Sequence, residues 1–300
     1  MRKLLSAFIC ACIMAAVVIA HGDDSHSANK QDVTVKVTKV SGNVYMLQGR
    51  GGNIGALTGP EGILIVDDDY KELSEKLRDA LKGLGSPTPR FILNTHWHGD
   101  HTQGNAFFGK ESVIIAHANV RKRMLEPPVI FGEKIAPYVS FALPIVTYTD
   151  SMSLNLNGEE IKIVHYPNGH TDGDSVIFFT KANVVHLGDD FFVGMFPFID
   201  LDSGGSVQGV IANVRSLIAS IPADAKLIPG HGPLATLDDL RAFLQMLVET
   251  STIVQDRMKA GKTLEEIKTA GLPAKYDAMG KGFIKTDFWI NILHRSYSKK

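Results

Sequence analysis

The sequence predicts a single layered α/β domain over residues 33–300. Short β-type runs alternate with amphipathic helical patterns there, and no change in composition separates them. No internal repeat or low-complexity segment interrupts the pattern. Four of the strand runs give way to glycine-marked turns that hold histidine or aspartate. A sheet delivers polar ligands to one edge in this way, so a functional site is expected at that edge.

The first half of the domain is rich in strands. We expect strands at Val33–Val40, Val44–Gln48, Ile54–Thr58, Ile63–Val66, Phe91–Asn94 and Val113–Ala116. A helix follows the fourth run, where apolar side chains recur on one helical face at Leu73, Leu77, Ala80, Leu81 and Leu84. A second, basic helix is expected around Val120–Leu125.

The second half combines strands with longer helices. Strands are expected at Ile161–His165, Ser175–Phe179, Val184–Leu187 and Lys226–Ile228, and helices around Val210–Ile221, Leu237–Lys259 and Thr286–Tyr297. Thr236 and Asp239 are spaced as a capping box at the start of the longest helix. The final helices either extend the outer layer or build a dimer contact.

Residues 126–148 differ from their surroundings because they combine four prolines with many apolar side chains. A long loop without its own periodicity is often functional. The segment is therefore either a lid or pocket wall, or an ordinary packed excursion.

The N-terminus predicts export. A positive start precedes an apolar stretch of 17 residues that ends at Ala20. This is typical of a secretory signal peptide over residues 1–20, and an uncleaved anchor is the alternative, although 17 residues barely span a bilayer. Residues 21–32 are polar and predict a flexible tail. The protein is expected to be periplasmic or secreted, without stable membrane insertion after cleavage.

Composition excludes several functions. Both cysteines, Cys10 and Cys12, lie in the signal peptide, so the mature chain has no disulfide and no thiolate ligand. Removal of the signal changes the net charge from −1 (31 basic, 32 acidic residues) to −3 (29 basic, 32 acidic). Without a basic excess, nucleic acid is not an expected partner. A small-molecule substrate is expected, and the oligomeric state is open.

Residues 96–101, His-Trp-His-Gly-Asp-His, are the most informative run of the chain. Alternate residues of an extended segment point the same way, so His96 and His98 can reach one ion together. Gly99 allows a sharp turn, after which Asp100 and His101 can face a second ion. Imidazole and carboxylate are ligands of zinc and related divalent ions.

Three further candidates lie in turns that follow strands: His170 in Asn-Gly-His-Thr-Asp, Asp189 in Leu-Gly-Asp, and His231 in Pro-Gly-His-Gly. With these motifs, in this order, the chain resembles the metallo-β-lactamase superfamily over roughly residues 33–235. The resemblance implies an αβ/βα sandwich of four layers. It also implies that His96, His98 and His170 bind one metal ion, that Asp100, His101 and His231 bind a second, and that Asp189 bridges both.

Such a centre predicts hydrolysis. Two divalent ions roughly 3.5–4 Å apart clamp an attacking and a leaving oxygen, and zinc lowers the pKa of its bound water to about 7. Hydroxide is then available at neutral pH to attack a carbonyl or phosphoryl centre. Asp100 is the candidate catalytic residue that orients the nucleophile and passes a proton to the leaving group. Zinc is the first choice of metal, with iron or manganese as alternatives, since the same ligands accept all three.

Asp67, at the end of the Ile63–Val66 run, matches a position that the family uses near the metal loop, and we expect it to orient a ligand. A strand-end cap is its alternative role. His117, His165, His186 and His294 are interpreted as core or surface histidines rather than ligands.

The residues around Asp189 restrict the substrate. In cysteine-containing metallo-β-lactamases its position carries cysteine, followed three residues later by a lysine that binds the carboxylate of the drug. Here the residues are Asp189 and Phe192, so the chain is more similar to glyoxalase II-like and lactonase-like branches. Residues 190–198 contain four phenylalanines, and their rings either line the site or fill the core. The possible pocket residues are Phe191, Phe192, Met195 and Phe196.

The run Ser203–Ser206 either caps the following helix or receives an anion at its N-terminus. The resulting hypothesis is an exported dinuclear hydrolase that opens an activated acyl bond in a lactone, thioester, ester or β-lactam. The alternative is a true β-lactamase. An iron-dependent sulfur dioxygenase and a non-catalytic ligand-binding module are further alternatives, and the complete ligand set argues against both.

Overall fold

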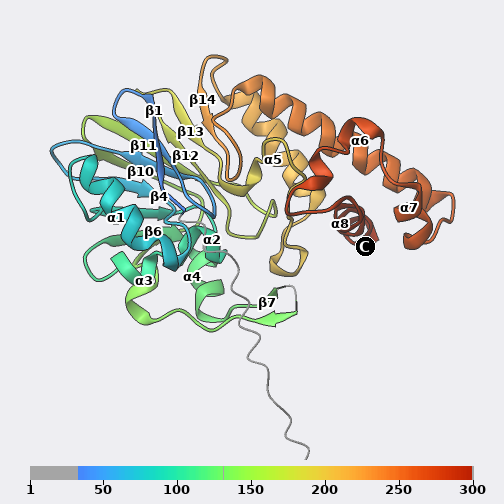
Figure 1. Ribbon diagram of the computed structural model, residues 1–300, viewed down its shortest axis with the longest axis horizontal. Coiled ribbons are helices and arrows are strands. Elements are labelled where there is room, and N and C mark those ends of the chain that lie inside the picture. The colour runs from blue at the N-terminus through green and yellow to red at the C-terminus, as the bar shows by residue number, and fades with distance from the viewer. Residues whose placement is uncertain (1–32, 131, 299–300) are drawn as a thin grey trace, which may run out of the picture. The chain divides into compact units, whose positions relative to one another are not determined.

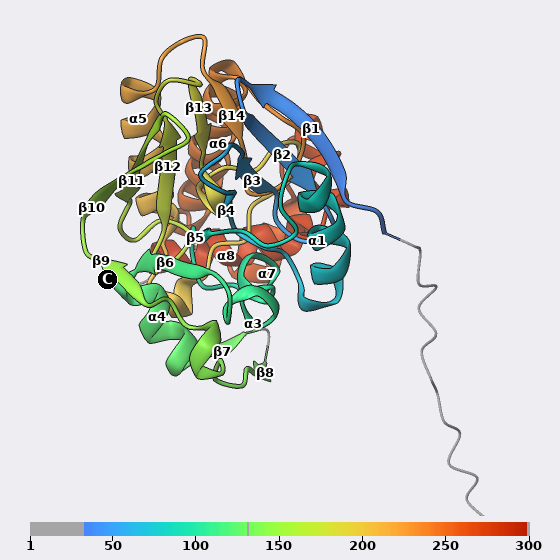
Figure 2. The same ribbon diagram turned by 90° about the vertical axis from the view of Figure 1, so that its left-hand side faces the viewer.

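The computed structural model describes residues 33–130 and 132–298. The predicted signal peptide and tail lie outside this range. Within it, two sheets stack face to face and helices cover their outer surfaces (Figures 1 and 2). This is the four-layer αβ/βα arrangement that the resemblance implies.

The first sheet has seven strands, in the spatial order β1-β2-β3-β4-β5-β6-β9. Their bounds are β1 (Lys36–Ser41), β2 (Val44–Gln48), β3 (Ile54–Leu57), β4 (Leu64–Val66), β5 (Phe91–Asn94), β6 (Val113–His117) and β9 (Val146–Tyr148). Pairing is antiparallel from β1 to β4 and parallel from β4 to β9. The carboxyl ends of β4, β5, β6 and β9 therefore lie at the same edge of the sheet. The histidine run follows β5 at this edge.

The second sheet has five strands in sequence order. They are β10 (Ser151–Leu156), β11 (Glu159–His165), β12 (Ser175–Phe179), β13 (Val184–His186) and β14 (Lys226–Ile228). Only the β13–β14 pair is parallel. Sequence analysis missed β10 because it is an edge strand without an apolar run. Its polar Ser and Asn residues alternate with Met and Leu. Asn157 and Gly158, both at positive φ, close the β10–β11 hairpin.

Alternation along the strands explains the layers. In β4, Leu64 and Val66 pack between the sheets, whereas Ile65 packs outward beneath α1 (Ser74–Gly83). In β13, Val184 points between the sheets and Val185 points outward. Each of these strands thus contributes side chains both to the layer between the sheets and to the layer beneath the outer helices. Both of its faces are therefore buried.

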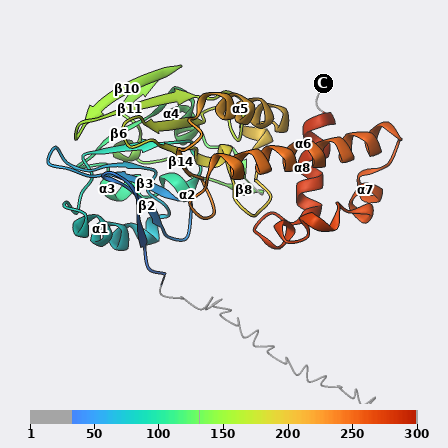
Figure 3. The same cartoon turned by 90° about the horizontal axis from the view of Figure 1, so that it is seen from above.

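The outer layer of the second sheet is formed by α5 (Val207–Ser220), α6 (Leu237–Lys259) and α8 (Thr286–Ser298). Figure 3 shows α6, α7 (Leu264–Ala270) and α8 extending to one side of the sheets. The bounds of α6 and its Thr236–Asp239 capping box are as predicted, while α7 was not predicted. Among the described residues, none of the helices has both the length and the apolar character needed to cross a bilayer.

The start of α5 answers the question about Ser203–Ser206. Ser206 is the N-cap of α5, and its side chain accepts a hydrogen bond from the Gly209 amide. The capping interpretation therefore holds.

The segment 126–148 contains short elements of its own, for which sequence analysis gave no prediction. It contains the hairpin β7 (Val129–Ile130) and β8 (Glu133–Lys134), and it ends in β9. It also packs on the short helices α2 (Gly99–Thr102) and α3 (Asn105–Phe108). Tyr138 hydrogen-bonds Thr102 at 2.7 Å, and the Ala142 carbonyl accepts from Asn105 at 3.1 Å.

Candidate metal centre

The candidate ligands meet where strands of both sheets end. His96, His98, Asp100 and His101 follow β5 in the first sheet. Asp189 follows β13, and His231 follows β14, in the second sheet. His170 lies in the connection between β11 and β12. The structure thus brings all seven side chains to one edge of the sandwich, although they span 136 positions from residue 96 to residue 231.

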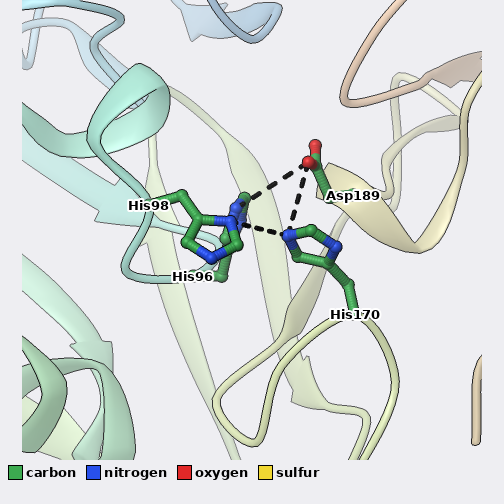
Figure 4. Close-up of side chains that lie close together, drawn as sticks. All are labelled: His96, His98, His170 and Asp189. Atoms are coloured by element: carbon green, nitrogen blue, oxygen red, sulfur yellow. Dashed lines mark hydrogen bonds and ion pairs between the residues drawn. The ribbon is translucent and has the colours of Figure 1, made fainter. Parts of the chain in front are cut away.

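The first group comprises His96, His98, His170 and Asp189, which are all buried (Figure 4). His170 Nε2 lies 2.8 Å from His98 Nδ1 and 3.5 Å from Asp189 Oδ2. His96 Nε2 lies 3.9 Å from the same carboxylate oxygen. Three imidazole nitrogens and one carboxylate oxygen therefore converge on one point.

The second group comprises Asp100, His101 and His231. His231 Nε2 lies 3.2 Å from Asp100 Oδ2 and 3.4 Å from His101 Nε2. The other oxygen of Asp189, Oδ1, lies 3.1 Å from His101 Nε2 and 3.5 Å from His231 Nε2. Asp189 therefore offers one oxygen to each group.

Two glycines allow this close approach. A Cβ atom at Gly52 would collide with the His101 ring, and one at Gly230 would collide with the Asp189 carboxylate. The two segments are also joined, since the Asn53 amide donates to the Gly230 carbonyl at 2.7 Å. Glycine at both positions lets backbone pack directly against the ligands.

The ring nitrogens that face away from the centre are held by other groups. His101 Nδ1 bonds to Asp67 at 2.8 Å, and His98 Nε2 bonds to Asp200 at 3.0 Å. His170 Nδ1 donates to the Phe198 carbonyl at 2.7 Å. Such partners fix the tautomer and the ring orientation, leaving the other nitrogen with a lone pair for a cation.

Asp67 connects two parts of the site. Besides His101, its carboxylate accepts hydrogen bonds from the Thr95 amide at 2.8 Å and the Thr95 hydroxyl at 2.7 Å. Its backbone adopts a left-handed φ of 64°, a conformation that costs energy in a residue other than glycine. The position next to β4 and these bonds are those expected of a residue that orients a ligand.

Asp200 is a residue of the candidate site that sequence analysis missed. It lies 102 positions from its partner His98, within an Ile-Asp-Leu-Asp run that follows no strand and matches none of the motifs used. Its carboxylate also accepts hydrogen bonds from the amides of Asp202 and Ser203. The only available signal was an aspartate in the apolar segment after Asp189.

The candidate ligands differ in their pKa values. Burial lowers the pKa of His170 to about 4, and burial with neighbouring imidazoles lowers that of His96 well below its usual value. Burial alone would raise the pKa of Asp100, but His101 and a hydrogen bond from His231 bring it to about 2. At neutral pH His96 and His170 are therefore neutral and Asp100 is ionised. Burial opposes protonation of His101 and His231 as well, but Asp189 and Asp100 outweigh it and raise the pKa of His231 to about 9 and that of His101 well above its usual value.

Two buried atoms support the presence of a cation. His96 Nε2 lacks a hydrogen-bond partner, and Asp189 Oδ1 faces His101 and His231 without the geometry of a hydrogen bond, although both atoms are shielded from solvent. Buried polar atoms are rarely left unsatisfied. Both point into the ligand groups, and the nitrogen and oxygen donors are those that zinc and related ions take. The residues therefore fit a metal centre.

A cavity of about 400 Å³ opens over the centre. His98, Asp100, Asp189 and His231 form its floor. Its walls are mostly apolar, namely Ile135, Phe192, Met195, Phe196, Phe198, Phe283 and Ile284, with Arg50, Tyr70, Gly99 and Gln103 completing the lining. Phe192 also stacks on the His231 ring, with centroids 5.2 Å apart.

One predicted pocket residue does not reach the cavity. Phe191 is fully buried and packs on Phe243 of α6. Its neighbour Phe192 points the other way, because successive residues of an extended segment alternate. Phe192, Met195 and Phe196 do line the cavity.

The other histidines of the described chain, His117, His165, His186 and His294, lie outside both ligand groups. His117 and His165 stack on each other with ring centroids 3.8 Å apart. His186 is buried and hydrogen-bonds the Asn53 carbonyl at 3.0 Å.

The sequence matches a known protein family over the segment that carries the candidate ligands. The model of the metallo-β-lactamase superfamily matches residues 37–231, which covers more than half of the chain and includes all the candidate ligands. The chain therefore belongs to the metallo-β-lactamase superfamily, and it is a metallo-hydrolase.

Curated relatives differ in what they act on. The chain is 21% identical to a linear primary-alkylsulfatase of Pseudomonas sp., over 69% of this chain and 47% of that protein. It is 26% identical to a hydroxyacylglutathione hydrolase of Rhodospirillum rubrum, over 53% of this chain and 54% of the relative. The chain thus spans about half the length of these two relatives.

Solved structures confirm the fold. A metallo-β-lactamase from Pontibacter korlensis superposes with a TM-score of 0.59 at 19% identity, covering 71% of this chain and 99% of that one. A sec-alkylsulfatase from Pseudomonas sp. superposes with a TM-score of 0.64 at 14% identity, covering 88% of this chain and 50% of the other. The alkylsulfatase therefore matches a larger share of this chain.

Proposed function

We propose that the protein is an exported hydrolase that binds two divalent metal ions and opens an activated acyl bond. Zinc is the proposed metal. The substrate is a thioester, lactone, ester or β-lactam with an apolar part. The observation that carries the proposal is the placement of Asp189, whose two oxygens serve two ligand groups beneath an apolar cavity. A carboxylate shared in this way favours two ions over one.

The metal ions would supply polarisation of the substrate and activation of water at neutral pH. The chain holds the reacting groups in place. Asp100 lies on the cavity floor, and its carboxylate is ionised at neutral pH because His101 and His231 lower its pKa. It can orient a nucleophilic water, accept a proton from it, and donate that proton to the leaving group.

Two observations favour an acyl substrate. The walls are aromatic and aliphatic, which suits an acyl chain better than a polyanion. Relatives also include the hydroxyacylglutathione hydrolase and an atrochrysone carboxyl ACP thioesterase of Aspergillus fumigatus, at 23% identity over 68% of this chain and 41% of that protein. Both names denote hydrolases of acyl compounds.

The first test is a panel of substrates offered to the purified, zinc-loaded protein. It contains an acyl thioester, a lactone, a 4-nitrophenyl ester and nitrocefin, a chromogenic β-lactam. The matched control carries His96→Ala and His98→Ala. Turnover of an acyl substrate that is lost in the control supports the proposal, and its absence from a protein shown to carry two metal ions rejects it.

A true β-lactamase is the alternative within the same panel. The carboxylate of a β-lactam needs a cationic partner, and Phe192 occupies the position of the lysine that serves cysteine-containing enzymes. Its ring stacks on His231 instead. Nitrocefin turnover that exceeds turnover of every other acyl substrate would favour this alternative.

A second candidate is hydrolysis of alkyl sulfates. The specific observation is the superposition of the sec-alkylsulfatase on 88% of this chain, together with an apolar cavity. Sulfate release from dodecyl sulfate, measured beside the acyl panel, discriminates the two substrate classes.

Export is a separate part of the proposal and rests on residues 1–20 of the sequence. Expression with and without these residues, followed by fractionation of the cells, tests it. Activity in the periplasmic or secreted fraction should require them.

A further inference from the structure

We infer that Arg50 is a specificity residue that binds an anionic group of the substrate, so that the enzyme selects amphiphilic anions. The preferred substrate carries a carboxylate or a similar single anion at one end and an apolar body at the other. This inference rests on the proposed function and deepens it, because it adds a charge requirement to the substrate.

The loop that carries Arg50 is fixed to the metal centre. Asp69 accepts hydrogen bonds from the amides of Arg50 at 3.1 Å and of Gly51 at 2.8 Å. The Gly52 amide donates to the Asp100 carbonyl at 3.0 Å. Asp69 itself is held at a left-handed φ of 59°. Hydrogen bonds therefore hold the loop in the site. The backbone beside Arg50 lies against two candidate ligands, Asp100 and His101.

The Arg50 side chain is directed by Tyr70. Its guanidinium lies 4.7 Å from the centroid of the Tyr70 ring, a distance at which the cation and the ring attract. Both residues line the cavity. This contact positions the guanidinium at the cavity, where its N–H groups can donate to a ligand.

The remaining partner of the guanidinium is weak. Glu72 lies 3.5 Å away, and both side chains are more than half exposed. Exposed ion pairs contribute little, about 0–1 kcal/mol. A substrate anion over the metal centre can therefore displace Glu72 at small cost, and can pair bidentately with the guanidinium.

The cavity lining combines one cationic side chain with apolar side chains from other elements. Among the residues that line it in the described chain, Arg50 is the only lysine or arginine. It comes from the β2–β3 connection of the first sheet, whereas Phe192, Met195 and Phe196 follow β13 of the second. A substrate that spans the centre thus meets a cation on one side and aromatic rings on the other.

The test compares Arg50→Met with the wild type on matched pairs of esters. One pair is 4-nitrophenyl hexanoate and mono-4-nitrophenyl adipate, which places the anion on the acyl side. The other is 2-nitrophenyl octanoate and 4-nitro-3-octanoyloxybenzoate, which places it on the leaving group. Each pair gives a selectivity ratio, the kcat/KM of the anionic ester divided by that of the neutral ester.

We expect Arg50→Met to lower this ratio roughly 10- to 100-fold for at least one pair, mainly through KM, as loss of a charge-assisted hydrogen bond predicts. Arg50→Lys should recover part of the selectivity ratio, since lysine restores the positive charge but not the bidentate geometry of the guanidinium. Arg241→Met is the control, because Arg241 is an exposed residue of α6 that pairs with Asp238 and does not line the cavity. It should leave the ratio unchanged.

Zinc content of each variant is measured alongside. Equal ratios in the wild type and Arg50→Met, at equal zinc content, overturn the inference about Arg50 while the proposed function stands. If the wild type hydrolyses no ester, thioester, lactone or β-lactam, the proposed function itself fails. Dodecanoate binding, followed by calorimetry in the wild type and in Arg50→Met, then still tests the anion site, and equal affinities overturn it.

Discussion

At the residue scale, the orientation of the imidazoles depends on carboxylates that are not themselves ligands. Asp200 holds His98 Nε2 at 3.0 Å, so that Nδ1 faces the other ligands. We predict that Asp200→Asn lowers zinc affinity about 10- to 100-fold, measured by competition with a chromogenic chelator.

The matched control for this change is Asp202→Asn. Asp202 lies two residues away and pairs with Arg295 at the surface, so its loss should leave zinc affinity intact. An Asp200→Asn protein that binds zinc as tightly as the wild type would contradict the role of Asp200.

A second residue-scale prediction concerns a buried pair of acids behind the site. Burial raises the pKa of Asp174 to about 7, although hydrogen bonds from Thr171 oppose this. Burial and the neighbouring Asp174 also raise the pKa of Asp190. Asp174 thus keeps its proton in the folded chain up to about pH 7, whereas it ionises near 3.8 when unfolded.

Unfolding therefore releases a proton from Asp174 between these two pH values, and its contribution to stability falls as pH rises through the window. The amide introduced by Asp174→Asn cannot ionise. We predict that the stability of this variant relative to the wild type increases by about 2 kcal/mol from pH 5 to pH 7.5. Urea unfolding of metal-free protein at both pH values measures this, with the exposed Asp277→Asn as control. A difference independent of pH would contradict it.

Residues also show how far the sequence predicts the site. His96, His98, Asp100 and His101 could be grouped because local spacing brings them together. His170, Asp189 and His231 could be added only because each follows a strand and matches a family motif. Asp200 could not be found, because its contact with His98 depends on how the chain folds between the two sheets.

At the element scale, prediction succeeded where apolar periodicity was strong. The bounds of β5, β12, β14 and α6 agree with the predicted ranges. It failed for β10, where exposed serine and asparagine hide an edge strand, and for α7, which has only seven residues and one buried side chain. Short elements carry too few apolar side chains for periodicity to identify them.

The β7–β8 segment gives a prediction at this scale. Ile135 follows β8 and lines the cavity. If the segment forms a substrate-contacting wall, Ile135→Asn should raise KM for octanoyl esters roughly 3- to 10-fold, because apolar contact with the chain is lost. KM for acetyl esters should change less, since the short acyl group does not reach the wall.

Val139→Asn is the control for Ile135→Asn. Val139 belongs to the same segment and is about half exposed, but it does not line the cavity. If both substitutions act alike on octanoyl esters, or neither acts, the segment serves only in packing.

At the scale of the whole molecule, the ligands come from both sheets. His96, His98, Asp100 and His101 extend from the first sheet, and Asp189 and His231 extend from the second. Metal ions bound there would link the two halves of the sandwich at one edge. A metal-loaded centre would therefore contribute to folding stability as well as to chemistry.

Removal of metal should then destabilise the whole domain. A ligand at 1,000 times its Kd stabilises the folded state by about 4 kcal/mol, which corresponds to a shift in Tm of roughly 8–16 °C for a domain of this size. We predict a loss of this order when the metal is removed with dipicolinate, together with loss of activity, and recovery of both when zinc is returned. Differential scanning calorimetry measures the shift.

The variant His96→Ala/His98→Ala identifies the origin of that shift. It retains Asp100, His101 and His231 but lacks two ligands of the first group, so dipicolinate should lower its Tm by a smaller amount. Asp189→Ala, which removes an oxygen from each group, should show the smallest shift of all. If the wild type keeps its Tm after complete metal removal, the carboxylates and imidazoles satisfy one another without a cation, and the two sheets are held by their apolar interface alone.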